Sequence, residues 1–250
     1  MDIKKILDEE IKKRDSIYEV CDERPDPILV ARKYKDPTIS LICSLFAYGN
    51  AKMIVKFLET LDFSLLKDSE KNIKKAFSNH YYRFQKSDDV INIFLTLRRL
   101  LLEDSLENIF LKGYKKEKSV LDGIGELIAK INDLNSYDSQ GYRFLISAMP
   151  NKLKPSLSSP LKRWNMFLRW MAREDNIDFG LWKSVDKSSL IIPLDTHTFS
   201  VSNKLGLLNR KQYDLKAALL LTDKLKEFDA SDPVKYDFAL YRIGQEKISF

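Results

Sequence analysis

The segment Ser158–Arg173, SSPLKRWNMFLRWMAR, places Lys162 just behind a proline and ahead of a run of large apolar side chains. Ser159 is a favourable N-cap and Pro160 suits the first helical position, so we expect a helix to begin here. Lys162 then lies in the first helical turn. There the unpaired backbone N–H groups and the helix dipole present partial positive charge, which disfavours an ammonium ion.

We therefore expect a lowered pKa for Lys162, because the helix start and desolvation beside Trp164 both favour the neutral amine. A neutral amine near pH 7 is the nucleophile that Schiff-base chemistry requires. The alternative is that Lys162 extends into solvent from an ordinary helix start. Helix statistics alone favour this alternative, so a chemical role needs more specific support.

The composition describes an ordinary globular protein of one large domain or two interlocked lobes. The chain has 250 residues, of which 44% are hydrophobic and 31% charged. No apolar run is long enough to cross a bilayer, and the acidic N-terminus does not resemble a signal peptide, so we expect a cytoplasmic protein. The net charge of +6 suits a polyanionic partner without identifying one.

Metal chemistry is not expected. The chain has two cysteines, Cys21 and Cys43, and two histidines, His80 and His197. These residues cannot complete a four-thiolate site, so we expect no metal ion, no iron–sulfur cluster and no other cofactor.

Hydrophobic periodicity and capping residues predict an all-α protein. The one extended stretch, residues 188–194 (SSLIIPL), is too isolated to form a sheet. Helices are expected over residues 2–20, 37–48, 90–104, 119–132, 142–149, 159–173, 195–208, 212–228 and 232–244.

Two motifs resemble the helix-hairpin-helix DNA glycosylases. The segment IPLDTHTFSVSNKLGL, residues 192–207, resembles their apolar approach, proline and Asp-Thr-His triplet that opens a helix. The segment PLKRWNMFLRWM resembles the second helix of their hairpin, in which the catalytic lysine stands three residues before an asparagine, here Lys162 and Asn165. The resemblance implies that Lys162 and Asp195 are catalytic; the alternative for Asp195 is a simple helix cap.

The departures from the family pattern favour its archaeal 8-oxoguanine glycosylase branch. KPSLSSP replaces the usual Leu-Pro-Gly-Val-Gly turn, and Lys162 and Asp195 are 33 positions apart, as is typical of that branch. The cluster-bearing members are excluded, because they need four cysteines. The AYG and YRF patterns at residues 47–49 and 82–84 are shared with bacterial relatives.

The same resemblance implies a pocket for the damaged base. DPVKYDFALYRIG, residues 232–244, resembles the helix that carries an aspartate and, four positions later, an aromatic residue, here Asp237 and Tyr241. Phe238 is a second candidate for stacking, and Asn50 stands near the position of a base-reading glutamine. The alternatives are ordinary ones: Tyr241 in the core, Asp237 as a solvated charge, and Asn50 beside a helix kink.

The resemblance implies a two-lobed helix-hairpin-helix glycosylase-like fold. Residues 1–250 would form a single catalytic unit of two interlocked helical lobes, with the hairpin at about 140–173 and the active site in the cleft between the lobes. We expect a monomer, associated with the bacterial nucleoid, that binds double-stranded DNA containing a damaged base. DNA contacts are expected from Lys152, Lys154, Ser159, Arg163 and Arg169, with Arg173 near them.

The implied activity is bifunctional: removal of 8-oxoguanine through a lysine Schiff base, followed by cleavage of the strand as an AP lyase. Two alternatives remain open. A monofunctional glycosylase for another damaged base would use Asp195 with water, and Lys162 would only contact DNA. A catalytically silent DNA-binding helical protein would retain the fold and the basic surface alone.

Overall fold

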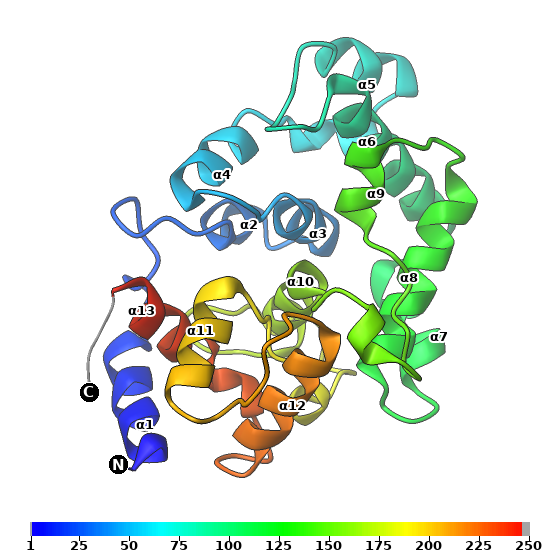
Figure 1. Cartoon of the computed structure of the whole chain (residues 1–250). Helices are drawn as coiled ribbons and strands as arrows, with labels where there is room; N and C mark the ends of the chain where they lie inside the picture. Colours follow the sequence, from blue (N-terminus) through cyan, green and yellow to red (C-terminus); the bar gives the residue numbers. More distant parts are fainter. Residues whose placement is uncertain (1, 247–250) are drawn as a thin grey trace. The chain divides into compact units, whose positions relative to one another are not determined.

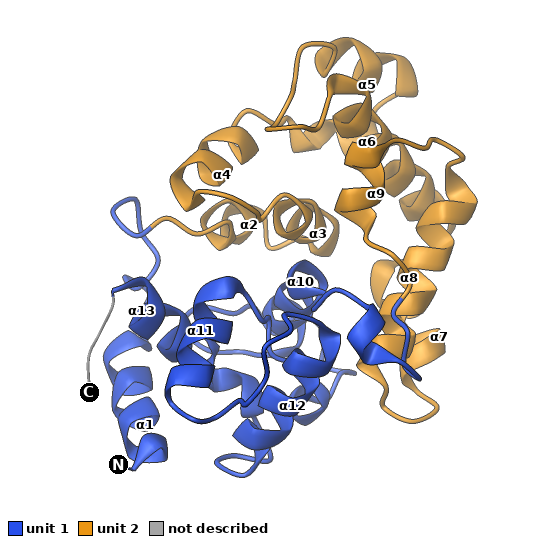
Figure 2. Ribbon diagram, in the orientation of Figure 1, with its two compact units in different colours: residues 1–24, 150–250 blue, residues 25–149 orange. Residues whose placement is uncertain are grey.

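The computed structural model describes residues 2–246 and confirms the all-α prediction (Figure 1). These residues contain thirteen α-helices, four short 3-10 helices and no β-strand. The chain divides into two compact units, shown in Figure 2: unit 1 is formed by residues 1–24 and 150–250, and unit 2 by residues 25–149. None of the described helices is both long and apolar enough to cross a membrane.

Unit 2 is a helical bundle in one continuous segment of chain. Its helices are α2 (Ile28–Tyr34), α3 (Pro37–Leu45), α4 (Ala51–Leu58), η1 (Phe63–Lys67), α5 (Glu70–Ala76), α6 (Ser87–Glu103), α7 (Leu106–Tyr114), α8 (Val120–Leu134) and α9 (Gln140–Ile146).

Helix α3 is the most deeply buried helix of unit 2. Asp36 caps it by accepting hydrogen bonds from the backbone N–H groups of Thr38 (2.8 Å) and Ile39 (3.0 Å), and Pro37 takes the first position. Every residue from Thr38 to Leu45 is buried, as expected for a continuously apolar helix.

A glycine allows α7 and α8 to pack closely. A Cβ atom added to Gly123 on α8 would lie 2.4 Å from the ring of Phe110 on α7. Only glycine can occupy such a contact without displacing the ring, so this position fixes the spacing of the helix pair.

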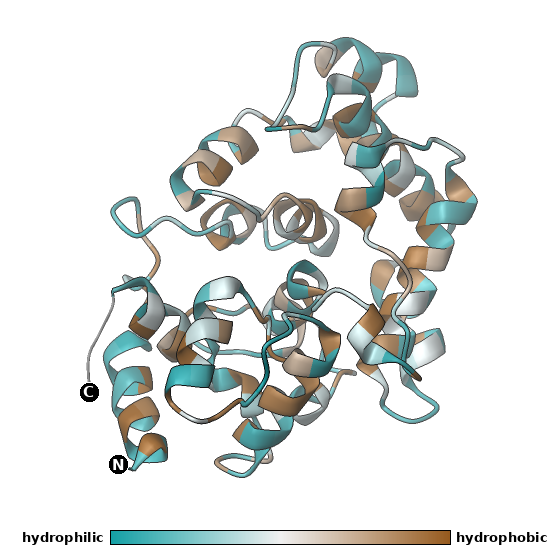
Figure 3. Cartoon of the chain, in the orientation of Figure 1, coloured by the Kyte–Doolittle hydropathy of each residue, from teal (hydrophilic) through white to brown (hydrophobic). Residues whose placement is uncertain are grey.

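Unit 1 combines both ends of the chain. Its helices are α1 (Ile3–Arg14), η2 (Pro155–Leu157), α10 (Lys162–Ala172), η3 (Lys187–Ser189), α11 (Thr196–Lys204), α12 (Leu215–Lys226), η4 (Pro233–Tyr236) and α13 (Asp237–Gln245). In Figure 3, α1 mixes hydrophilic and hydrophobic residues, and it ends at Arg14, short of the helix expected over residues 2–20.

Two buried arginines form ion pairs between the N-terminal segment and α13 with its C-cap residue. Arg14 donates hydrogen bonds to Glu10 on its own helix and to Glu246, at 2.8 Å from its Nη2. Arg242 on α13 donates from Nε to Glu19 at 2.6 Å. Removing one partner of such a buried pair is costly, so these contacts hold the start of the chain against its end.

Helix α10 is the core of unit 1. All residues from Trp164 to Met171 are buried, and Trp164, Phe167 and Trp170 are fully so. The backbone carbonyl of Trp170 accepts a hydrogen bond from Phe179 N (3.0 Å), and that of Met171 accepts one from Trp182 N (2.7 Å). The following loop thus satisfies the carbonyl groups that the helix end leaves open.

The extended stretch before α11 is buried but not paired in a sheet. Residues 190–194 are all buried. The backbone N–H of Ile192 donates instead to the Oγ1 atom of Thr222 on α12 at 3.0 Å. A side chain therefore replaces the missing strand partner.

Candidate active site

Unit 1 brings three predicted residues into one electrostatic neighbourhood. Lys162 begins α10, Asp195 is the N-cap of α11, and Asp237 begins α13. Helix α11 packs against α13, and the charges of both Lys162 and Asp195 act on the carboxyl group of Asp237. We call these three residues the Lys–Asp–Asp site.

The helix start at Lys162 differs from the expected one. Its N-cap is Leu161, in the left-handed conformation (φ 55°, ψ 33°), and no side chain caps the helix. Ser159 is therefore not the cap, and it is exposed. The shift of two residues places half-buried Lys162 at the first helical position, so the expectation that it lies in the first turn is confirmed.

Asn165 fixes the geometry of this turn. Its backbone N–H donates to the carbonyl of Leu161 at 2.9 Å, and its side-chain Nδ2 donates to the carbonyl of Pro160 at 3.1 Å. Asn165 is buried, with 1% of its surface exposed. The asparagine three residues after the lysine thus stabilises the strained left-handed residue before it.

Asp195 caps its helix, as the simpler interpretation proposed. Its Oδ1 accepts a hydrogen bond from the backbone N–H of Thr198 at 2.8 Å. The preceding residue, Leu194, accepts a hydrogen bond from the hydroxyl of Tyr213 at 2.7 Å. Burial raises the pKa of Tyr213, and the charge of Asp195 adds to this effect. Capping and a role in chemistry are compatible, because a carboxylate has two oxygens that accept hydrogen bonds.

Asp237 is a buried carboxyl group, not a solvated one. It is 7% exposed and accepts a short hydrogen bond from Nη1 of Arg169. Burial raises its pKa to about 6, Arg169 and Lys162 oppose the shift, and the negative charge of Asp195 adds to it. A carboxyl group with a pKa near 6 exists in both protonation states close to neutral pH.

Arg169 does not lie on the surface, and the prediction that it contacts DNA is wrong. Only 3% of it is exposed. Besides Asp237, it pairs through Nε with Asp178 at 3.2 Å, and its guanidinium lies 4.6 Å from the ring centre of Phe238. A guanidinium enclosed by two carboxylates and a ring has no face left for a phosphate.

Arg173, one turn further along α10, is likewise buried and paired with acids. Its Nη1 lies 2.5 Å from Asp178, and its Nε lies 2.9 Å from Asp232. Arg169 and Arg173 thus form a structural network behind the Lys–Asp–Asp site.

The aromatic candidates on α13 face different surroundings. Tyr241 is half-buried and meets the ring of His197 edge to face, with 5.9 Å between the ring centres. Phe238 instead lines a pocket of about 250 Å³ together with Arg169, Arg173 and Lys235. Neither Asp237 nor Tyr241 is among the residues that line this pocket, so Phe238 is separated from the other two candidates there.

Asn50 lies in unit 2 and caps α4. Its side-chain oxygen accepts a hydrogen bond from the backbone N–H of Met53 at 3.2 Å, and the residue is exposed. This role accounts for Asn50 without a bound base.

The AYG and YRF patterns form one aromatic cluster within unit 2. The hydroxyl of Tyr82 donates to the carbonyl of Tyr48 at 2.7 Å, and the two rings meet edge to face. Gly49 has φ +98°, and a Cβ there would lie 2.4 Å from Nη1 of Arg83, whose guanidinium sits over the ring of Tyr48. Glycine is needed because the arginine occupies the space of a side chain.

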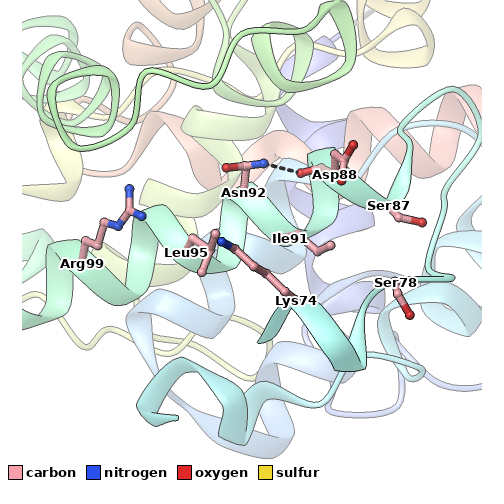
Figure 4. Close-up of a pocket in the computed structure, with 8 residues that line it drawn as sticks. All are labelled: Lys74, Ser78, Ser87, Asp88, Ile91, Asn92, Leu95 and Arg99. Carbon is pink, nitrogen blue, oxygen red and sulfur yellow. Dashed lines mark hydrogen bonds between the residues drawn. The ribbon is translucent and has the colours of Figure 1, made fainter. Parts of the chain in front are cut away.

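One pocket of unit 2 contains none of the predicted site residues. It has a volume of about 490 Å³ and lies between α5 and α6, where Lys74, Asn92 and Arg99 line it (Figure 4). Asn92 donates to the backbone carbonyl of Asp88 at 2.8 Å. Arg99 is held by Glu70 at 2.9 Å, which leaves its charge compensated.

The remaining basic candidates lie around the start of α10. Lys152 and Lys154 are exposed, and Arg163 is half-buried. Two residues that the sequence analysis missed share this segment: Leu153 and Leu157 are 95% and 73% exposed. The sequence pattern that could have indicated them is a pair of leucines within a turn-rich segment of lysines and serines. Within residues 2–246, no group of three or more His, Cys, Asp or Glu side chains is arranged to hold a metal ion.

Comparisons with known proteins identify the family of the chain. No curated protein matches it. No solved structure matches it either. Residues 26–246 match the family described as "Protein of unknown function (DUF2400)". Because this match covers most of the chain, the protein belongs to the DUF2400 family.

Proposed function

We propose that this protein is a DNA glycosylase with AP lyase activity, and that Lys162 is its nucleophile. The observation that carries the proposal is the Lys–Asp–Asp site: a lysine at the start of α10 and a carboxyl group at the start of α11, whose charges both act on the buried carboxyl group at the start of α13. The resemblance of the two motifs to helix-hairpin-helix glycosylases adds to it, and the glycosylase-like form of the all-α fold is part of this proposal.

In the proposed reaction, the amine of Lys162 attacks the C1′ carbon of a nucleotide rotated out of the duplex. The bond between C1′ and the base breaks, and the base leaves with the electron pair. Opening of the sugar ring gives an imine between Lys162 and C1′. Loss of a C2′ proton then expels the 3′ phosphate by β-elimination, and water releases the lysine.

Asp195 has two tasks in this scheme. It accepts a proton from the attacking amine, and its negative charge stabilises the positive charge that develops on the sugar. The cap on α11 holds Oδ1 in place at 2.8 Å from Thr198 N, so the carboxylate is preorganised. Preorganised charge stabilises a transition state without further rearrangement.

We propose 8-oxoguanine as the substrate, on the resemblance to the archaeal branch and on the properties of Asp237. The damaged base differs from guanine by a proton on N7 and an oxygen on C8. A carboxylate accepts a hydrogen bond from such an N–H group. Asp237, with a pKa of about 6, is largely ionised at pH 7.5 and serves as that acceptor. A hydrogen bond from Arg169 holds the carboxyl group of Asp237 in place.

The partner in this proposal is duplex DNA. Lys152 and Lys154 lie in the segment that leads into α10, Arg163 lies in its first turn, and these residues supply phosphate contacts. Arg169 has no part in this binding, because Asp178 and Asp237 enclose it.

A single-turnover assay on a panel of duplexes tests the proposal. Each duplex carries one lesion: 8-oxoguanine, uracil, an alkylated purine or an oxidised pyrimidine. We expect release of 8-oxoguanine followed by strand cleavage, both abolished by Lys162→Gln and retained by Lys187→Gln, a change at an exposed lysine of unit 1. Base release without lyase activity would instead indicate a monofunctional glycosylase. No release from any duplex would leave a DNA-binding protein without this chemistry.

A further inference from the structure

The segment that leads into α10 displays two leucines to solvent. Leu153 is 95% exposed and Leu157 is 73% exposed, and Leu153 is the most exposed large hydrophobic residue in the described part of the chain. We call residues 150–161 the leucine loop. Scattered exposed leucines are ordinary, but two within five residues of one loop expose apolar surface at neighbouring positions of the chain.

The leucine loop is ordered by its own hydrogen bonds. The backbone N–H of Asn151 donates to Oγ of Ser158 at 2.9 Å, and the side chain of Asn151 accepts from the backbone N–H of Lys154 at 2.8 Å. The carbonyl of Ser158 accepts from Leu215 N at 2.9 Å, which ties the loop to α12. The two leucines are therefore held out by a fixed loop.

The sequence of the loop and of its flanks carries charge of one sign. Lys152 and Lys154 flank Leu153, and both are exposed. No aspartate or glutamate occurs between Asp138 and Glu174, although the chain has 36 acidic residues. Exposed apolar surface in a purely basic stretch is complementary to a polyanion that also offers an apolar surface, and stacked DNA bases within two phosphate backbones have both properties.

We propose that Leu153 and Leu157 form a wedge that enters the DNA duplex where a nucleotide leaves the base stack, while Lys152 and Lys154 hold the neighbouring phosphates. This inference rests on the proposed function for the identity of the partner. Rotating a nucleotide outward removes stacking from its neighbours. Leucine side chains that fill the gap restore apolar contact and lose their own exposure to water.

The position of the loop favours DNA over other partners. Pro160 and Leu161 end the leucine loop and lead directly into Lys162, so a wedge here is joined covalently to the proposed nucleophile. Two leucines are also too small a surface for a stable protein interface. An anionic membrane offers similar chemistry and is one of the outcomes of the test.

The test measures unstacking and binding without chemistry. The full chain carries Lys162→Gln, and the duplex carries one 8-oxoguanine beside 2-aminopurine, which fluoresces more when it is unstacked. The wedge variant is Leu153→Ser with Leu157→Ser. The matched control is Leu102→Ser, a leucine on α6 that is 72% exposed.

We expect the wedge variant to lose most of the fluorescence increase and to bind the damaged duplex about tenfold more weakly. Its affinity for undamaged duplex and its salt dependence should remain within about twofold of the parent, because the lysines are unchanged. Leu102→Ser should behave like the parent. Since all three leucines are exposed, each variant should keep its melting temperature.

Parental fluorescence and parental lesion affinity in the wedge variant would overturn the inference. So would a loss of binding to vesicles containing anionic lipid with no change on DNA. The proposed function is judged separately: with Lys162 restored, borohydride trapping by the wedge variant shows that the lysine chemistry stands even where the wedge does not.

Discussion

Replacing Asp237 by asparagine is expected to change how protein stability depends on pH. The pKa of Asp237 in the folded protein is about 6, compared with 3.8 as its ordinary value. The folded state therefore binds a proton between these two values that the unfolded chain releases. Stability from this group is present at low pH and is lost as the pH rises through about 6. The total loss is about 3 kcal/mol.

Asparagine keeps the volume of the side chain and still accepts a hydrogen bond from Arg169, but it does not titrate. The measurement is urea unfolding of both proteins at pH 4.5, 6 and 8. The free energy of unfolding of the parent minus that of Asp237→Asn should fall by about 2 kcal/mol from pH 4.5 to pH 8, whatever constant offset the lost charge introduces.

Asp223→Asn is the matched control, because Asp223 is an exposed carboxylate on α12 of the same unit. Its difference from the parent should stay within about 0.5 kcal/mol over the same range. A difference for Asp237→Asn that is flat or rises with pH would refute the account of Asp237 as a group whose ionisation is opposed by burial.

Three further predictions concern chemistry, binding and folding. Asp195→Asn should preserve the cap on α11 and melt like the parent, yet slow base release by a factor of roughly a hundred or more. Asp195→Ala should in addition cost about 1 kcal/mol of stability. Equal single-turnover rates for Asp195→Asn and the parent would show that Asp195 has no role in catalysis. Binding to undamaged duplex should weaken steeply with salt, and Lys154→Ala or Arg163→Ala should each lower by about 1 the slope of the logarithm of the binding constant against the logarithm of the salt concentration. Slopes equal to the parent's would mean that neither residue touches phosphate. Gly49→Ala should destabilise the protein by about 1–3 kcal/mol in urea unfolding, because φ is +98° and a Cβ would lie 2.4 Å from Arg83; an unchanged midpoint would show that Arg83 moves aside freely.

Local rules predicted the helical class and the position of Lys162 in a first turn, because periodicity and a proline near a helix start are local signals. The same rules predicted the wrong N-cap residue for α10. Ser159 has a strong N-cap preference, but the helix begins after Leu161, which is buried and left-handed. Packing of a buried leucine outweighs the conformational cost, and a sequence window of a few residues does not contain that packing.

The buried arginines show the same limit for the site. Arg169 and Arg173 look like surface cations from composition, but two of their partners, Asp232 and Asp237, come from distant parts of the chain, and the third, Asp178, comes from the loop after α10. Only the packing of α13 and the loop after α10 makes the pairs. The capping role of Asp195, by contrast, was predictable because both partners lie within three residues.

Borohydride trapping followed by peptide mapping identifies the residue that attacks the DNA. The protein is mixed with a duplex containing 8-oxoguanine, reduced with sodium borohydride and digested, and the peptide that carries the DNA remnant is sequenced. We expect one covalent adduct, located on Lys162 and absent in Lys162→Gln. An adduct on another residue, an adduct that persists in Lys162→Gln, or base release with no adduct in the parent protein would contradict this expectation.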